Sequence, residues 1–237
     1  MMKRALTGIP VLMLCLTLVS CAGTGSVTTQ EPLKQQILVD KARMTLENFL
    51  SDEDTRMFKE YAKKALGLYI VPDLYKGAWI FGGSGGRGVL FVRDMDTGKW
   101  AGPAFYDLGS VSVGFQFGGQ KSEVIMLVMT RKGIESLFST TIKLGGDASV
   151  AMGPVGKGLQ GATAPSLNVD YISYARNMGV FLGMSLDGAV IKENYNWNRA
   201  YYGKPVRPLD ILVAKKVANP HSNKIRTALA KAFPLNR

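Results

Sequence analysis

The sequence predicts an α+β domain: an antiparallel β-sandwich or barrel-like core of about eight to ten short strands, packed by N-terminal amphipathic helices. Residues 31–66 repeat apolar side chains at helical spacing, which indicates the helices. The following residues, up to 203, hold short apolar runs separated by turn residues at intervals of roughly ten, which is typical of an antiparallel sheet. About two hundred residues suffice to bury one core without cross-links.

Residues 1–20 are typical of a secretory signal peptide. A basic start precedes an uncharged run from residue 5 to residue 20, which is too short to span a membrane comfortably. The run ends in Leu-Val-Ser-Cys, which resembles a bacterial lipobox, so Cys21 is predicted to become the lipidated N-terminus. Residues 21–30 would then form a lipidated tether of small and polar residues. An ordinary signal peptide cut near Ala22 is the alternative.

Two amphipathic helices are expected next. The first extends from Glu31 to about Phe49, and the second extends from Glu53 to Leu66, with Asp52 as its cap. The polar faces carry lysines, namely Lys34, Lys41, Lys59, Lys63 and Lys64. These helices either face the core with a solvated basic side, or use the lysines to contact phosphate headgroups.

The stretch 76–92, KGAWIFGGSGGRGVLFV, is predicted to form a glycine-rich loop between two apolar runs. It contains the pattern G-x-G-x-x-G, but a strand rather than a helix follows, which excludes the dinucleotide-binding interpretation. The other motifs of a kinase are missing as well. Either the loop is a plain hairpin, or its N–H groups form an anion nest. The candidate headgroup-binding residues of this loop are Gly83, Gly85, Gly86 and Arg87.

Further strands are expected after this loop. The run from Lys99 to Tyr106 is interrupted at Gly102-Pro103, which indicates an edge or a bulge. Residues 110–118 alternate between apolar and polar, which predicts one half-buried strand, and the unbroken apolar run 124–129 predicts a central strand. Other predicted strands are 148–152, 169–174, 180–186 and 189–192, with Asp187-Gly188 as a hairpin turn between the last two.

Short helices are expected among and after the strands. One covers residues 131–139, and a second, aromatic helix covers residues 194–202 and ends at Gly203. Residues 155–164 are rich in Gly, Ala and polar residues, which favours a loop. A last helix is predicted after Ser222, with one apolar face formed by Ile225, Leu229 and Phe233.

Cysteine and charge exclude several classes of protein. The only cysteines are Cys15, in the predicted signal peptide, and Cys21, so the mature body would have no disulfide, thiolate nucleophile or cysteine metal site. The chain carries a net charge of +11, and residues 204–237 contribute +7 because eight Lys or Arg oppose Asp210 alone. A basic C-terminal tail is predicted there, which favours anionic lipid headgroups; export makes nucleic acid an unexpected partner.

Catalytic and metal-binding residues are not expected. The lone histidine, His221, lies in a proline-flanked segment, so neither a histidine triad nor a histidine metal cluster is predicted. Asp94 and Asp96 suit a hairpin turn better than a calcium site, because further oxygen ligands are not visible beside them. No cofactor is predicted, and the protein is not expected to be an enzyme.

Six blocks of sequence occur in order: KGAWIFGGSGGRGVLFVRD, GKWAGPAF, SVGFQFGGQKSEVIMLVM, IKLGGDASVAMGPVG, YARNMGVFLGMSLDGAVI and NRAYYG. Together they resemble the SYLF lipid-binding family over residues 33–203. The resemblance implies lipid binding through an N-terminal amphipathic helix and the domain surface, here residues 33–66 and the glycine loop 82–88. Eukaryotic relatives bind phosphoinositides, and some bind actin; neither is an expected partner of an exported bacterial lipoprotein. The family supplies no catalytic residues, and the tail 204–237 lies outside the resemblance.

The sequence therefore predicts a non-enzymatic lipoprotein that is anchored through Cys21 and whose domain 31–203 binds anionic phospholipid headgroups. Because Ala22 rather than Asp follows the cysteine, the expected location is the periplasmic face of the outer membrane. The alternative is a structural envelope protein that binds a partner protein or glycan and uses lipid only as an anchor. A third hypothesis is an enzyme that acts on lipid phosphates at the glycine loop.

Overall fold

The computed structural model describes residues 33–78, 81–113, 118–154 and 168–235. They belong to one compact unit, Pro32–Arg237. The predicted signal peptide, Cys21, the tether and the predicted loop 155–164 lie outside the described residues.

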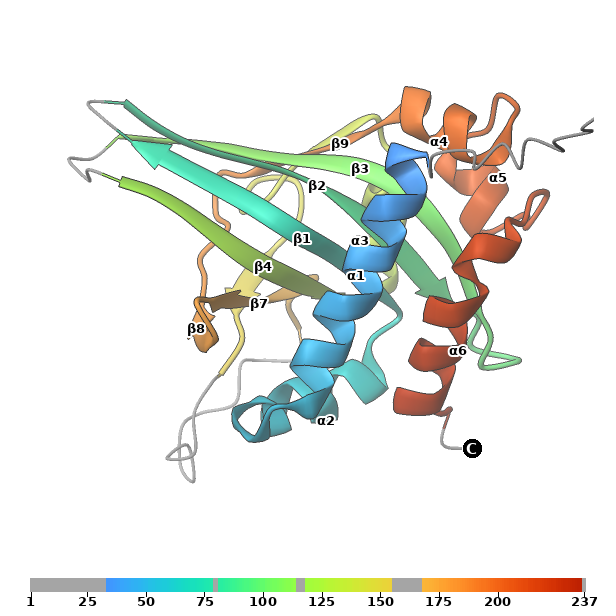
Figure 1. Ribbon diagram of the computed structural model, residues 1–237, viewed down its shortest axis with the longest axis horizontal. Helices are drawn as coiled ribbons and strands as arrows, with labels where there is room; N and C mark the ends of the chain where they lie inside the picture. Colours follow the sequence, from blue (N-terminus) through green and yellow to red (C-terminus); the bar gives the residue numbers. More distant parts are fainter. Residues whose placement is uncertain (1–32, 79–80, 114–117, 155–167, 236–237) are drawn as a thin grey trace, which may run out of the picture. The chain divides into compact units, whose positions relative to one another are not determined.

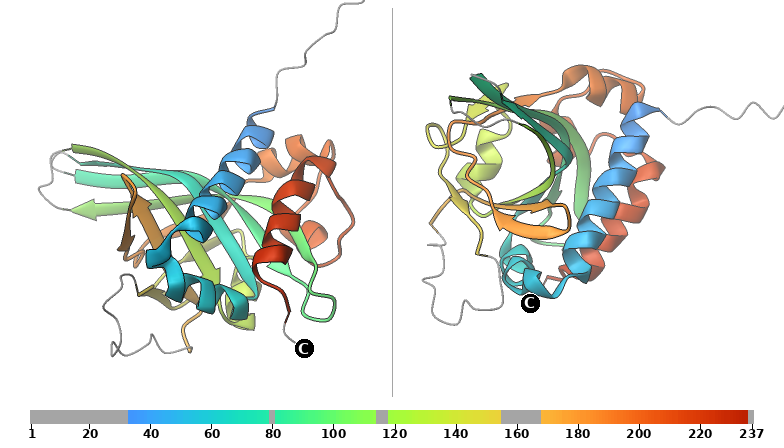
Figure 2. Two further views of the ribbon diagram at one scale, coloured as in Figure 1. Left: turned by 60° about the horizontal axis from the view of Figure 1, so that its bottom comes forward. Right: turned by 60° about the vertical axis from the view of Figure 1, so that its left-hand side comes forward.

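The described residues form one nine-stranded sheet in the order β5-β9-β3-β2-β1-β4-β7-β6, with β8 paired to β7. The sheet curls into a half-barrel (Figure 2), which confirms the predicted α+β class with a barrel-like core. All strand pairs are antiparallel except β6 with β7. The strands are β1 (Gly67–Ala78), β2 (Phe81–Arg93), β3 (Trp100–Val113), β4 (Gly118–Val128), β5 (Thr141–Lys143), β6 (Val150–Met152), β7 (Tyr171–Asn177), β8 (Val180–Gly183) and β9 (Val190–Glu193). Strands β1 to β4 are 11 to 14 residues long, so they are not the short strands that were predicted.

Six α-helices lie within the described residues: α1 (Lys34–Ser51), α2 (Arg56–Lys64), α3 (Arg131–Ser136), α4 (Tyr195–Tyr202), α5 (Pro208–Leu212) and α6 (Asn223–Ala232). Helices α1 and α6 lie side by side on the outer face of the curled sheet (Figure 2). The far ends of β1 to β4 extend beyond these helices (Figure 1). One part of the outer face is therefore covered by helices, and another part is bare.

Alternation along the strands produces two cores, one on each face of the sheet. The outer core, against α1, α2, α4 and α6, includes Leu68, Ile70, Val89, Phe91 and Phe105. The inner core, to which α5 also contributes, includes Tyr69, Val71, Leu90, Tyr106 and Val124. Helix α1 buries Leu38, Ala42, Leu46 and Phe49, so its apolar face is committed to the outer core.

A β-bulge in β1 decides which side chains reach the bare part of the outer face. Ile70 pairs with Val89 and Asp73 with Arg87, so two residues of β1 lie opposite Gly88 alone. The bulge shifts the alternation by one residue, and Asp73 therefore shares the outer face with Ile70. Glycine is needed beneath it, because a Cβ on Gly88 would lie 2.6 Å from the carbonyl oxygen of Ile70.

The predicted glycine loop is wrong. Residues 82–88 lie inside β2: residues 82–87 are paired on both sides, for example Gly85 with Tyr75 of β1 and with Gly109 of β3, and Gly88, opposite the bulge, pairs with Tyr106 of β3. Strand β1 ends at Ala78 and β2 begins at Phe81, so the glycines come after the start of β2. Extended backbone with a strand on each side uses its N–H groups in the sheet, so these glycines do not form an anion nest.

One further prediction about strands was wrong. Asp187-Gly188 does not close a hairpin, because β8 pairs with β7 whereas β9 pairs with β3 and β5. The local pattern was compatible with a hairpin, and pairing with distant strands decided otherwise. Of the strand predicted over residues 110–118, residues 110–113 lie in β3 and Gly118 begins β4, whereas residues 114–117 lie outside the described residues.

Other predicted elements are confirmed. Gly102-Pro103 lies at a register shift between β2 and β3 and has a cis peptide bond. Helix α4 ends at Gly203, which has a φ of +70° and so adopts the left-handed conformation that glycine favours. Ile225, Leu229 and Phe233 of the last helix are all buried in the outer core.

The segment predicted as a separate basic tail packs against the sheet. Val206, Ile211 and Leu212 belong to the inner core, and α6 belongs to the outer core. Arg93 at the end of β2 joins the segment to α2: its guanidinium donates to the carbonyl oxygens of Lys63 and Ala65, at 2.7 and 2.5 Å, and to that of Phe233 at 3.3 Å. Residues 204–235 are therefore part of the folded unit.

Candidate functional site

A groove runs between α1 and the bare part of the sheet, and we call it the α1 groove. One part, of about 400 Å³, is lined by residues of α1, β1, β4 and the end of β7. A second part, of about 430 Å³, is lined by Leu38 of α1 and by residues of β1, β2 and β3. The two parts share Asp73, and α1 borders both. The first part is lined by Met44 and by the charged side chains of Lys41, Asp73, Lys121, Glu123 and Arg176.

Asp73 stands at the centre of the α1 groove, where the bulge directs it. Its two carboxylate oxygens accept Lys41 Nζ from α1 and Lys121 Nζ from β4, each at 2.7 Å. Burial would raise the pKa of Asp73, but the hydrogen bonds and charges of Lys121 and Lys41 outweigh it and lower that pKa. The hydrogen bond with Asp73 raises the pKa of Lys121. Asp73 and Lys121 therefore both stay ionised at neutral pH.

Glu123 fixes the neighbouring part of the α1 groove. It accepts Arg176 Nη1 of β7, Thr45 Oγ1 and Asn48 Nδ2 of α1, each at 3.0 Å. These bonds hold α1 against the sheet and orient the Arg176 guanidinium. The side chains of Lys41 and Lys121 remain 47% and 55% exposed, so their ammonium groups can bind an anion from solvent.

Arg87 lies in the second part of the α1 groove but is held by protein groups. Its Nε donates to Asp107 Oδ1 at 2.7 Å, and its guanidinium lies 4.0 Å from the ring centroid of Trp197 on α4. Asn194 Nδ2 donates to the other oxygen of Asp107 at 2.8 Å. Arg87 therefore contributes charge and an ordered wall to the α1 groove.

Cations exceed carboxylates along the α1 groove: Lys41, Arg87, Lys121 and Arg176 oppose Asp73, Asp107 and Glu123. Gly85 leaves the floor bare, because a Cβ there would meet no atom within 4 Å. The site is thus a shallow, open trough with a net positive charge. Such a trough suits binding of an anionic surface better than enclosure of a small molecule.

The α1 groove continues into an exposed stripe along α1. Lys34, Ile37, Lys41 and Met44 follow one another at spacings of three and four residues, so they lie on one face of the helix. Ile37 and Met44 are 42% and 56% exposed, although both are large and apolar. Lysines interleaved with exposed apolar side chains are typical of surfaces that bind at a membrane interface.

The structure brings only part of the predicted site together. Lys41, Gly85, Gly86 and Arg87 line the α1 groove, and Lys34 lies on the same stripe of α1. Gly83 precedes them in the bare part of β2, where a Cβ would come no closer than 3.4 Å to the carbonyl oxygen of Ser110.

The predicted lysines of the second helix lie elsewhere, on α2 beyond the C-terminal end of α1 (Figure 1). Lys63 pairs with Glu60 at 2.9 Å, Lys59 donates to the carbonyl oxygen of Asp52 at 3.1 Å, and Lys64 is exposed. The candidate site therefore contains Lys41 of the first predicted helix, but none of the lysines predicted on the second helix.

The acidic residues and half of the cations of the α1 groove were not predicted from the sequence. Period-two alternation in β4 places Lys121 and Glu123 on one face, and this signal is readable once residues 118–128 are recognised as one strand. Asp73 could not be placed from alternation alone, because the bulge at Pro72 reverses its direction.

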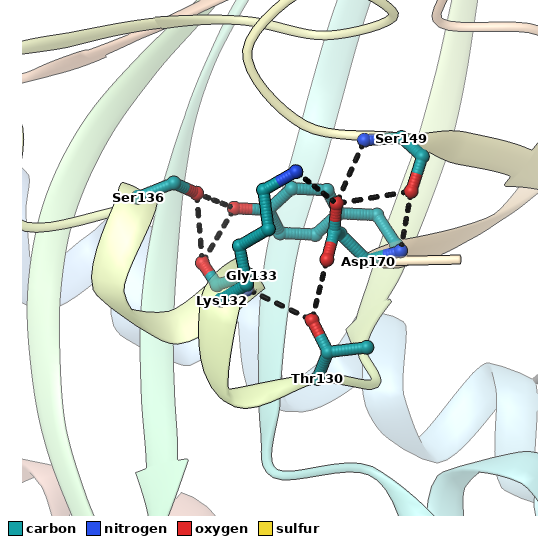
Figure 3. A network of polar contacts seen from close by, with 7 residues as sticks. Thr130, Lys132, Gly133, Ser136, Ser149 and Asp170 are labelled. Atoms are coloured by element: carbon teal, nitrogen blue, oxygen red, sulfur yellow. Dashed lines mark hydrogen bonds and ion pairs between the residues drawn. The ribbon is translucent and has the colours of Figure 1, made fainter. Parts of the chain in front are cut away.

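A second polar cluster, around Asp170, is structural. Asp170 accepts Thr130 Oγ1 at 2.5 Å and both the N–H and Oγ of Ser149 at 2.9 Å (Figure 3). Nearby, Tyr171 Oη and Ser136 Oγ lie 2.6 Å apart, and burial raises the pKa of Tyr171 to about 12. Each hydroxyl is already engaged in joining α3 to β6 and β7. Within the described parts of the chain, no group of three or more His, Cys, Asp or Glu side chains could hold a metal ion.

None of the helices among the described residues is both long enough and apolar enough to cross a membrane.

A curled sheet packed by helices, with an open charged groove, defines a binding domain. A family model described as "Ysc84: Las17-binding protein actin regulator" matches residues 109–232, more than half of the chain. The chain belongs to this family, which is also called SYLF, and the predicted resemblance is confirmed. The match continues past Gly203 through α5 and α6, whereas the resemblance was expected to end there. The description names binding and regulation rather than catalysis.

Curated relatives come from animals and fungi. The chain is 31% identical over 150 residues to human SH3 domain-containing YSC84-like protein 1, covering 63% of this chain and 43% of the human protein. It is 30% identical over 178 residues to the SH3 domain-containing protein PJ696.02 of Schizosaccharomyces pombe, covering 73% and 41%. With LAS seventeen-binding protein 3 of Saccharomyces cerevisiae, identity is 31% over 144 residues, covering 60% and 31%. The chain thus spans less than half the length of these relatives.

Proposed function

We propose that this protein is a lipid-anchored, non-enzymatic member of the family that binds anionic phospholipid headgroups through the α1 groove. The observation that carries the proposal is the pair Lys41 and Lys121. Both ammonium groups bond to one carboxylate, remain about half exposed, and border a bare sheet face. Each ammonium has three donors, so both retain donors for the oxygens of a phosphodiester.

Membrane attachment would combine two signals. Acyl chains on Cys21 supply the anchor, and the α1 groove supplies electrostatic attraction; two such signals give stable attachment where one chain gives reversible binding. The location that follows from the residue after Cys21 is the periplasmic face of the outer membrane. Phosphatidylglycerol and cardiolipin are headgroups of suitable charge.

Vesicle co-sedimentation tests the proposal without the anchor. Both cores lie within Pro32–Arg237, so a chain that begins at Ala22 keeps every residue of the folded unit. We expect it to sediment with vesicles that contain phosphatidylglycerol and not with pure phosphatidylcholine, and to lose binding as salt rises. Equal binding to both vesicles, or binding to neither, would contradict headgroup recognition.

Paired variants locate the binding surface. A lysine near an anionic membrane contributes about 1 kcal/mol, so Lys41→Gln with Lys121→Gln should weaken binding about thirtyfold. Glutamine keeps a hydrogen-bond donor beside Asp73, which protects the fold. The matched control is Lys63→Gln with Lys64→Gln on α2, for which we expect a much smaller loss. Equal losses from the two pairs would indicate diffuse attraction to all basic surfaces.

A second candidate function is suggested by the relatives. The family description and the yeast relative's name both state binding to a protein, and the description adds actin regulation. A protein partner bound by the same domain, with lipid serving only as anchor, is therefore the competing proposal. Pull-down with the chain from Ala22, with and without vesicles, separates the two: a partner retained after Lys41→Gln with Lys121→Gln would favour protein binding. Actin is not an expected partner if the chain is exported.

A further inference from the structure

The turn between β7 and β8 carries a methionine that folding does not explain. Asn177 pairs with Val180, so Met178 and Gly179 alone form the turn, and their φ angles are +48° and +84°. Two-residue turns with both φ angles positive favour asparagine followed by glycine, because other side chains are strained there. Met178 is also 96% exposed, so its packing offsets none of that strain.

Met178 and a second exposed methionine line the same part of the α1 groove. Met44 of α1, 56% exposed, lines the same part of the groove as Met178 and Gly179. We call Met44 and Met178 the methionine rim. Two elements distant in sequence thus place apolar side chains on the edge of one groove, where water rather than protein covers them.

Cations lie behind the methionine rim in the same part of the groove. Arg176 is two residues before Met178, and Lys41 is three residues before Met44 on α1. Apolar side chains at the edge with cations behind them match the layers of a membrane surface, where acyl chains lie deeper than phosphates. Free phosphate would engage the cations but would leave the methionines in water.

We infer that the methionine rim inserts into the interface of an anionic glycerophospholipid membrane, so that the β7–β8 turn faces the lipid and phosphodiesters meet Lys41, Lys121 and Arg176. This inference rests on the proposed function and adds an orientation to it. Thioether side chains are flexible and polarisable, and they adapt to an irregular apolar layer better than branched side chains do.

Single-cysteine labelling tests the orientation, because the chain from Ala22 contains no cysteine. Met178→Cys is labelled with an environment-sensitive fluorophore, and Met95→Cys is the matched control. Met95 is 47% exposed in the turn between β2 and β3. Register places this turn at the opposite end of the sheet, because Val92 aligns through Gly67 and Val128 with Tyr171, at the far end of β7 from Met178.

With phosphatidylglycerol-containing vesicles, we expect a blue shift at position 178, quenching there by spin-labelled acyl chains, and neither at position 95. Soluble glycerophosphoglycerol should leave the spectrum at position 178 unchanged. An equal response at both positions would overturn the inference. Sedimentation with the vesicles but no response at 178 would overturn the inference and leave the proposed function standing, whereas no sedimentation would overturn both.

Met178→Asn supplies an independent readout. Asparagine suits the turn, so the variant should be at least as stable as the parent, yet lose about tenfold in vesicle affinity because one apolar side chain no longer leaves water. Vesicle affinity equal to that of the parent would overturn the inference. Because affinity is expected to fall while stability is kept or raised, misfolding cannot produce the expected result.

Discussion

Removing the guanidinium of Arg93 should loosen the two helix ends that meet beneath it. Arg93 is 3% exposed, and α2 ends at Lys64 while α6 ends at Ala232, so both helices present unpaired carbonyls there. The Nη2 atom donates to Lys63 and Ala65 at 2.7 and 2.5 Å, and Nη1 reaches Phe233 at 3.3 Å. In Arg93→Met these carbonyls would stay buried without donors.

The magnitude follows from the two short bonds. Hydrogen bonds to a charged donor contribute about 1.5–3 kcal/mol each, and burying the charge of the guanidinium in the folded state offsets part of the gain. We therefore expect Arg93→Met to lower the free energy of unfolding by about 3 kcal/mol. For a domain of this length that corresponds to a fall in Tm of about 6–12 °C. Arg93→Lys keeps the charge but has only one nitrogen, so its free energy of unfolding should lie between that of the parent and that of Arg93→Met.

Urea and thermal unfolding followed by circular dichroism measure this loss. Arg199→Met, an exposed arginine on α4, is the matched control and should change stability by less than about 0.5 kcal/mol. Amide exchange should also rise in α6 of Arg93→Met, because the contact with α2 is lost. The reasoning is refuted if Arg93→Met is as stable as the control Arg199→Met, or if Arg93→Lys is as unstable as Arg93→Met.

Two further predictions concern the sheet and the Asp170 cluster. Gly88→Ala would place a Cβ 2.6 Å from the carbonyl oxygen of Ile70, so it should destabilise by about 3 kcal/mol or more in urea unfolding, whereas Gly85→Ala, with open space around it, should be close to neutral. Burial raises the pKa of Asp170, but hydrogen bonds from Thr130 and Ser149 outweigh it and lower that pKa. Because the folded state favours the carboxylate form of Asp170, this stabilisation is complete above the ordinary carboxyl pKa of 3.8 and is lost as pH falls through the lower pKa of the folded state. Asp170→Asn should therefore lose about 2 kcal/mol at neutral pH and show a flatter fall in stability in acid; an unchanged acid limb would contradict this assignment.

The sequence predicted best those elements whose signals are local. Helix α4 ends at Gly203 because only a residue tolerant of positive φ continues the chain there. Helix α6 follows from its apolar stripe, and the interruption at Pro103 follows from the missing N–H of proline. In each case the physical cause lies within a few residues, so the pattern was sufficient.

The errors arose where distant strands decide. Glycines usually mark turns, but Gly86 and Gly88 lie inside a strand because the bulged backbone of β1 leaves no room for a Cβ. The candidate site was only partly predicted for the same reason. Lys41 and Arg87 were recognised as isolated cations, whereas Lys121, Glu123 and Arg176 join them only through the β1–β4 and β4–β7 registers.

The bulge at Val71–Pro72 shifts the alternation of outward and inward side chains along β1 by one residue. Before it, even-numbered residues of β1 point outward; after it, odd-numbered residues do, so Asp73 points outward and Leu74 is buried inside. Deleting one residue here would leave composition and charge almost unchanged. It would, however, exchange the solvent-facing and the buried positions along the rest of the strand. Whether a side chain of β1 reaches the surface therefore depends on its position relative to the bulge as much as on its identity. Sequence comparisons across Pro72 should be aligned on the bulge first.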